Sequence, residues 1–83
     1  MADGAARADR GQGAGVRPMT ASEVEVRLAA AGFVHARTRG SHFVWVHPSS
    51  GRTTVVPHHG DRPLPQGLLL AIFRQSGVPK PRR

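Results

Sequence analysis

The chain has 83 residues, which is enough for one small domain, and it contains no cysteine, which excludes disulfide bonds and thiolate metal sites. Its formal charge is +7, and all but one of its 12 Lys and Arg residues are arginine. This balance favours an anionic partner, with nucleic acid as the default. Codon bias in a GC-rich genome would give the same excess of arginine, so the charge alone does not name the partner.

Composition divides the chain into three parts. Residues 1–18 are mostly Ala, Gly, Asp and Arg, and we predict a disordered tail there because little apolar surface is available to offset the ordering entropy. A single domain is expected over residues 19–79, followed by a basic tail at 80–83. The longest apolar run, residues 68–73, is too short to span a membrane, and no secretion signal is evident, so we expect a cytoplasmic protein with no membrane partner.

The first predicted element is a helix over residues 21–31. Thr20 and Glu23 have the spacing of a capping box, in which each side chain satisfies the other's backbone amide. Val24 and Leu28 follow at helical spacing and form one apolar stripe. Gly32 then predicts the end of the helix.

Three strands are predicted next, at residues 33–38, 41–47 and 52–57. A hairpin turn at Arg39-Gly40 joins the first two, and a longer turn at residues 48–51 joins the second and third. Because both connections are so short, the strands must pair antiparallel.

A second helix is predicted over residues 65–76, with Pro65 at its first position and Gly77 at its end. The fold class is therefore α+β in the order α-β-β-β-α. Packing both helices on one face of a three-stranded antiparallel sheet is the economical arrangement, and it leaves the other face open. The double-stranded-RNA-binding fold has this element order.

The main candidate for chemistry is His42, which follows the Gly40-Ser41 turn directly. An imidazole can accept and return protons near neutral pH. Strand alternation places Phe43 and Trp45 on the face opposite His42, but the sequence does not say which face meets the helices. His42 is available for catalysis if those aromatic residues fill the core; otherwise it merely caps a turn.

Arginines near this histidine could bind phosphate through their planar, multi-donor guanidinium groups. The candidates are Arg37, Arg39, Arg62 and Arg74, although each taken singly could be an ordinary solvated charge. A base that removes a ribose 2′-hydroxyl proton, beside donors that stabilise charge on the phosphate, is what metal-free RNA cleavage requires. DNA lacks that hydroxyl, so it would be spared.

The remaining histidines do not predict a metal site. His58 and His59 enter a loop after the third predicted strand, where functional residues concentrate, but solvated loop histidines are the simpler interpretation. His35 and His47 are expected to be structural or exposed. The spacings match no familiar zinc pattern, and carboxylates for a two-magnesium nuclease are few. We therefore expect neither a metal nor another cofactor.

Four segments together resemble the HicA toxin family, in order and at sensible spacing over nearly all of residues 19–83. They are Gly40-Ser41-His42, Val55-Val56-Pro57-His58-His59-Gly60, Leu64-Pro65-Gln66-Gly67 and Ile72-Phe73-Arg74-Gln75-Ser76-Gly77-Val78. The Gly-Ser-His element is short, and the specificity comes from the set.

The resemblance implies a double-stranded-RNA-binding-like fold and an mRNA-cleaving activity, held in check by a HicB-like antitoxin. His42 falls on the family's catalytic histidine, with Gly40 and Ser41 in the same motif. His59 falls on the histidine after the Val-Pro element, and Arg74 on the basic position of the last helix.

Two alternatives remain at this stage. A non-catalytic RNA-binding module could keep the basic surface without needing any histidine. A protein-interaction domain could instead use the leucines at residues 68–70 as an exposed patch.

Overall fold

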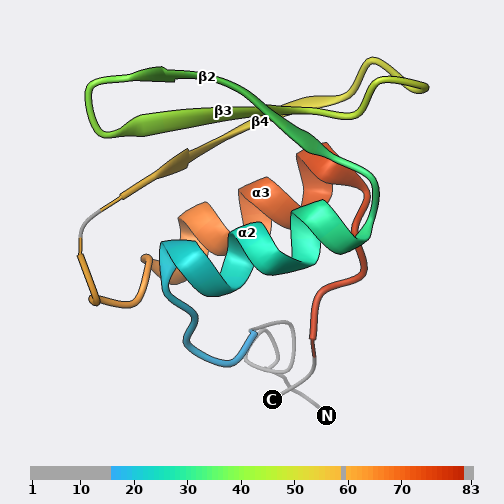
Figure 1. Ribbon diagram of the computed structural model, residues 1–83. Coiled ribbons are helices and arrows are strands. Elements are labelled where there is room, and N and C mark those ends of the chain that lie inside the picture. The colour runs from blue at the N-terminus through green and yellow to red at the C-terminus, as the bar shows by residue number, and fades with distance from the viewer. Residues whose placement is uncertain (1–15, 59, 82–83) are drawn as a thin grey trace, which may run out of the picture.

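The computed structural model describes residues 16–58 and 60–81 (Figure 1). Residues 1–15 of the predicted 1–18 tail, His59 and the last two residues of the basic tail lie outside the described part. The elements follow the predicted order: α2 (Ala21–Ala30), β2 (Val34–Arg39), β3 (His42–Val46), β4 (Thr53–Pro57) and α3 (Gln66–Ser76). Each bound lies within one residue of the sequence prediction, and the α+β class is confirmed.

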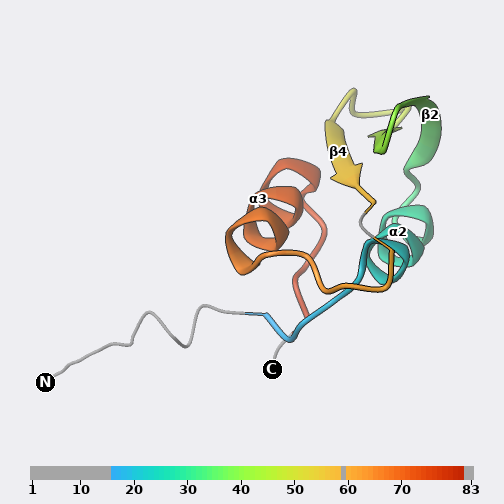
Figure 2. The ribbon, with the colours of Figure 1, turned by 90° about the vertical axis from the view of Figure 1, so that its left-hand side faces the viewer.

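The three strands form one antiparallel sheet in the order β2-β3-β4. Figures 1 and 2 show both helices on the same side of this sheet, with the other side uncovered. We call the covered side the helix face and the uncovered side the outer face. Two helices suffice for one face only, so the outer face of this small sheet is left to solvent.

Helix α2 begins and ends as its sequence predicts. The Thr20 hydroxyl accepts from the Glu23 amide, and the Glu23 carboxylate accepts from the Thr20 amide, which completes the capping box. At the other end the Phe33 amide reaches back to the Leu28 carbonyl at 3.0 Å, and Gly32 has a φ of 98°. These are the features of a Schellman ending, which needs a residue tolerant of the left-handed region.

Helix α3 is bound to the sheet by a polar contact as well as by its apolar face. Leu69, Ile72 and Phe73 are buried, and Gly77 ends the helix in the left-handed conformation. The Thr54 hydroxyl on β4 donates to the Gln75 side-chain oxygen at 2.8 Å. Thr54 is almost completely buried, so this bond satisfies a hydroxyl that would otherwise be costly to bury.

The core extends further towards the N-terminus than the sequence indicates. Val16, within the predicted 1–18 tail, is fully buried. Its backbone forms two hydrogen bonds with the Gln66 side chain, through the Val16 amide at 3.0 Å and the Val16 carbonyl at 2.8 Å. The folded part therefore includes Val16, because a side chain 50 residues away supplies the partners that its backbone needs.

The turn between β2 and β3 consists of Gly40 and Ser41, one residue later than predicted, since Arg39 pairs with His42. Gly40 has a φ of 59°, and no described residue other than glycine has a positive φ. A positive φ at the first turn residue followed by a negative φ at the second is typical of a type II′ hairpin turn. This turn type explains why the first position is glycine.

Candidate functional site

The cross-strand pairing decides which face each side chain of β3 occupies. Trp45 pairs with Thr54 and Phe43 with Val56, and paired residues point to the same face. Thr54 and Val56 are buried beneath the helices, so Trp45 and Phe43 also lie on the helix face. Neighbouring residues in a strand alternate, which places His42 on the outer face.

His42 is exposed at the first position of β3. Within residues 16–58 and 60–81, its imidazole makes no hydrogen bond or ion pair. No described residue therefore occupies either ring nitrogen, and an incoming ligand can approach both. The sequence allowed His42 to lie either on the exposed face or on the face that meets the helices, and the structure places it on the exposed face.

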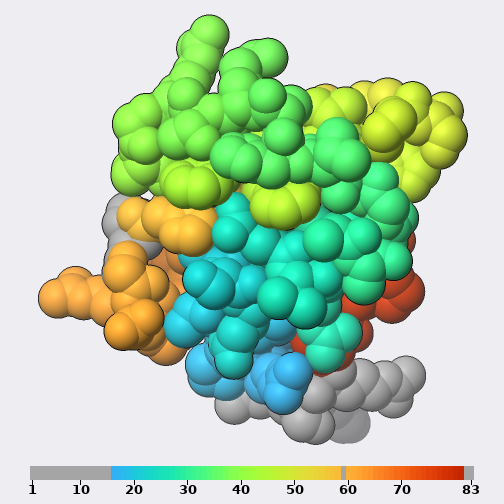
Figure 3. Space-filling model, viewed as in Figure 1, coloured from blue at the N-terminus to red at the C-terminus, as the bar shows by residue number. Residues whose placement is uncertain are grey.

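Arg37 and Arg39 join His42 on the outer face because of a β-bulge. The pairing passes from His35 opposite Trp45 to Arg37 opposite Val44, so Ala36 is an extra residue in β2. Regular alternation from His35 would have placed both arginines on the helix face. The bulge reverses the alternation and turns the two guanidinium groups to the side of His42. Figure 3 shows side chains of this hairpin standing clear of the helices.

The segment after β4 lies at the same end of the molecule as the β2–β3 turn. The His58 amide donates to the Ser41 carbonyl at 2.7 Å, which brings the two segments together. The segment is drawn in orange below the green turn in Figure 1, and Arg62, which belongs to it, is exposed. Gly40, Ser41 and Arg62 therefore belong to the same end as His42.

One predicted site residue does not join this group. Arg74 is exposed in the last turn of α3, at the opposite end of the molecule from the β2–β3 turn (Figure 1). It borders a hollow with Leu70, Phe73 and Val78 instead. The other family position, His59, lies outside the described residues.

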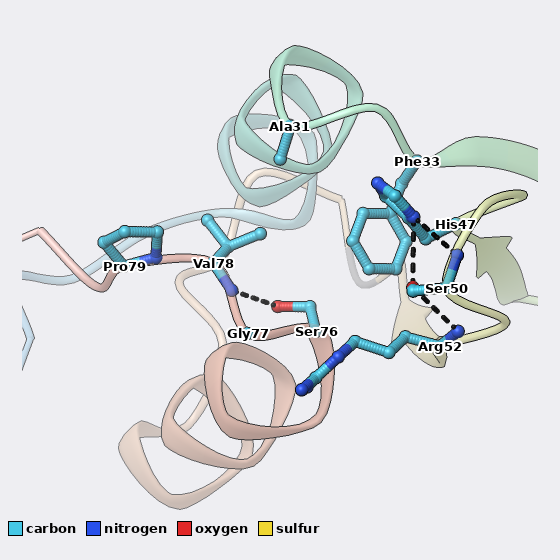
Figure 4. A pocket seen from close by; sticks show the side chains of 9 residues that line it. All are labelled: Ala31, Phe33, His47, Ser50, Arg52, Ser76, Gly77, Val78 and Pro79. Carbon is cyan, nitrogen blue, oxygen red and sulfur yellow. Dashed lines mark hydrogen bonds between the residues drawn. The ribbon is translucent and has the colours of Figure 1, made fainter.

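The opposite end of the sheet has a histidine of its own, shown in Figure 4. His47 Nδ1 accepts from the Ser50 amide at 3.2 Å, and the Ser50 hydroxyl lies 3.0 Å from the same nitrogen. The ring also meets Phe33 edge-on, with centroids 5.1 Å apart. These residues, with Arg52, border a pocket of about 310 Å³. His47 is a structural residue, as the sequence indicated.

A hydrogen-bonded pair of Glu25 and His58 on the helix face was not predicted. Glu25 on α2 accepts a hydrogen bond from the Trp45 indole at 2.8 Å, and its other oxygen lies 2.8 Å from His58 Nε2. The His58 ring also packs on Phe43, with centroids 4.1 Å apart. The sequence shows only a helical glutamate and a loop histidine 33 residues apart, so no local signal could have joined them.

The leucine run of α3 does not form the exposed patch that an interaction domain would use. Leu69 is buried, and Leu68 and Leu70 are partly buried against the core. The exposed large apolar side chains among the described residues are Val26, Val34 and Val55.

Two further findings concern metals and membranes. No group of three or more His, Cys, Asp or Glu side chains that could hold a metal ion is found in the part of the chain that the structure describes. None of the helices in that part has the length and apolar character needed to cross a membrane.

The site can therefore be stated in chemical terms. One solvent-exposed imidazole, able to move a proton, stands on an open sheet face with two guanidinium groups that suit phosphate oxygens. The class of protein that these features define is a small basic α+β domain with an exposed histidine and two arginines on an open sheet face.

The comparison with protein families gives the identity of the domain. Residues 21–78 match the model of the HicA toxin of bacterial toxin–antitoxin systems. The match covers more than half of the chain, and the chain belongs to this family. Membership implies a HicB-like antitoxin as partner. Among curated proteins, no sequence matches the chain.

Proposed function

We propose that this protein is an endoribonuclease toxin that cleaves mRNA without a metal ion and uses His42 as its catalytic residue. The single observation that carries the proposal is the exposure of His42 on the outer face, with Arg37 and Arg39 beside it on β2. The order of the elements, which is that of the double-stranded-RNA-binding fold, is consistent with an RNA substrate.

In the proposed reaction His42 removes the proton from a ribose 2′-hydroxyl. That oxygen attacks the adjacent phosphorus and displaces the 5′-oxygen of the next nucleotide, which takes a proton from water; the products are a 2′,3′-cyclic phosphate and a new 5′-hydroxyl. Arg37 and Arg39 stabilise the charge that develops on the phosphate oxygens. A placed histidine contributes about 10²–10⁴-fold to such a step.

The proposed cellular setting follows from the family. A HicB-like antitoxin binds the toxin and keeps it inactive in the cytoplasm until the antitoxin is lost. His59 and Arg74 fall on family positions, and we propose that they and Arg62 support RNA binding. The geometry favours His42, Arg37 and Arg39 as the centre of the site.

The test is cleavage of a single-stranded RNA by the purified chain in excess EDTA, beside DNA of the same sequence. We expect cut RNA with 2′,3′-cyclic phosphate ends, intact DNA and no effect of the chelator. RNA that stays intact although the chain binds it would favour the non-catalytic RNA-binding module. Cleavage that EDTA abolishes would contradict the metal-free mechanism.

A further inference from the structure

The Glu25 carboxylate links α2 to strand β3 and to the segment that follows β4. Only 15% of its side chain is exposed, and each of its two oxygens has its own donor, the Trp45 indole on one side and the His58 ring on the other. A carboxylate accepts hydrogen bonds but cannot donate one, so His58 presents its Nε2 proton to it. A shielded charge needs such partners, and losing one of them is costly.

The backbone of the same histidine holds the residue before His42. The His58 amide donates to the Ser41 carbonyl at 2.7 Å. That carbonyl belongs to the peptide group that joins Ser41 to His42. A hydrogen bond to it fixes the plane of this peptide and, with it, the direction in which the His42 side chain leaves the backbone.

The ring of His58 holds the residue after His42. Its centroid lies 4.1 Å from that of Phe43, with 31° between the ring planes. His58 therefore contacts both chain neighbours of His42, one through its backbone and one through its ring. Its own position is in turn fixed by Glu25 on α2.

We infer that Glu25 and His58 are positioning residues, which hold the β2–β3 turn so that His42 points at the scissile phosphate. The inference rests on the proposed function. His58 does not itself touch the substrate, because its ring lies with Phe43 and Glu25 on the helix face whereas His42 lies on the outer face. The two histidines thus have separate tasks on opposite sides of the sheet.

Four variants test the inference. Glu25→Ala and His58→Phe remove the pair, and the phenyl ring can still pack on Phe43. Glu25→Gln keeps an acceptor for the Trp45 indole, and its side-chain N–H can donate to Nε2 of the other neutral His58 tautomer. His35→Phe is the matched control, because His35 also stacks on Phe43, at 5.0 Å, but its hydrogen-bond partner among the described residues is Thr38 of its own strand.

Cleavage rate and amide exchange are measured for each variant below its unfolding temperature. We expect Glu25→Ala and His58→Phe to lower kcat about tenfold, since small misplacements of a catalytic group have large effects, with KM little changed. Because both act through one contact, the double variant should be no slower than either single one. Glu25→Gln and His35→Phe should retain the parent kcat.

The exchange of the His58 amide is the readout that does not depend on activity. It should become faster in Glu25→Ala and His58→Phe and stay unchanged in His35→Phe. Equal slowing of cleavage by His58→Phe and His35→Phe, or unchanged exchange in Glu25→Ala, would overturn the inference. If the parent chain does not cut RNA, the proposed function fails, while the exchange rates still decide whether Glu25 and His58 hold the turn.

Discussion

The two ends of the sheet carry the same residue types and use them in opposite ways. At one end His42 is exposed beside Arg39 and, within the described residues, has no hydrogen-bonding partner. At the other end His47 is held by the Ser50 amide and hydroxyl, and Arg52 donates to a carbonyl of α3. A histidine near serine and arginine is thus a candidate for chemistry only where its nitrogens are unused.

The connecting turns cause this difference. The two-residue turn of Gly40 and Ser41 is too short to fold over its neighbours, so His42 starts its strand in the open. The longer β3–β4 connection curls back, with the Gly51 amide bonded to the His47 carbonyl at 2.8 Å. This turn places the hydroxyl groups of Ser49 and Ser50 within hydrogen-bond distance of His47 Nδ1.

Exchanging each histidine for alanine should give the largest contrast between the ends. His42→Ala is expected to lower the cleavage rate about 10²–10⁴-fold and to leave Tm unchanged, because no described residue forms a hydrogen bond or ion pair with the ring. His47→Ala should retain the rate and lose roughly 1–2 kcal/mol of stability, through its hydrogen bonds and its contact with Phe33.

Calorimetry and RNA cleavage on the same preparations check this pair. A loss of 1 kcal/mol lowers Tm by about 4–8 °C in a domain of this size. If both variants cut RNA as fast as the parent, His42 is not the catalytic residue. If His47→Ala is the inactive one, the assignment of the two ends is reversed.

Alanine substitutions at the two turn glycines should distinguish an effect on the position of His42 from an effect on overall stability. Gly40 and Gly51 have φ of 59° and 78°, and an added Cβ would meet nothing within 4 Å at either position. Alanine at each should therefore cost a similar 1–2 kcal/mol or so, from backbone strain alone. Only Gly40→Ala is expected to slow cleavage, by about tenfold, because it shifts the turn that aims His42.

Denaturant unfolding and initial cleavage rates, measured on both variants, decide this prediction. Equal slowing by Gly51→Ala would mean that the rate follows overall stability rather than the β2–β3 turn.

The smallest expected effect is on the salt dependence of RNA binding. Arg39→Gln should reduce the slope of log affinity against log salt by about 0.7, the value for one lost phosphate contact on single-stranded RNA. Arg52→Gln removes the same charge at the other end, where the guanidinium donates to the Gln75 carbonyl, and should leave the slope unchanged.

Fluorescence anisotropy on a His42→Ala background, which prevents cleavage during the titration, provides the measurement. An equal drop of the slope in both variants would show that the RNA responds to total charge and not to the outer face.

Local signals predicted the elements well. The capping box of Thr20 and Glu23 and the glycine endings at Gly32 and Gly77 lie where their sequence motifs placed them. Such signals depend on neighbours a few residues away in the chain, so they can be read without knowing the fold. The Gly-Ser-His motif likewise marked the turn before His42.

Contacts between distant segments could not be predicted in the same way. The burial of Val16 depends on Gln66, and the Glu25–His58 pair joins a helix to the end of a strand. The bulge at Ala36 is similarly invisible, because it appears only when β2 is paired with β3. In each case, the tertiary packing determines which distant residue becomes the contact partner.

By itself, the amino-acid sequence determined the order of helices and strands, their caps, the basic charge and the family. The tertiary structure decided which sheet face meets the helices, and therefore that His42 is exposed while Phe43 is not. It also decided that Arg37 and Arg39 share that face, through one extra residue in β2. The physical reason is that periodicity separates the two sides of a strand, whereas only packing chooses which side is buried.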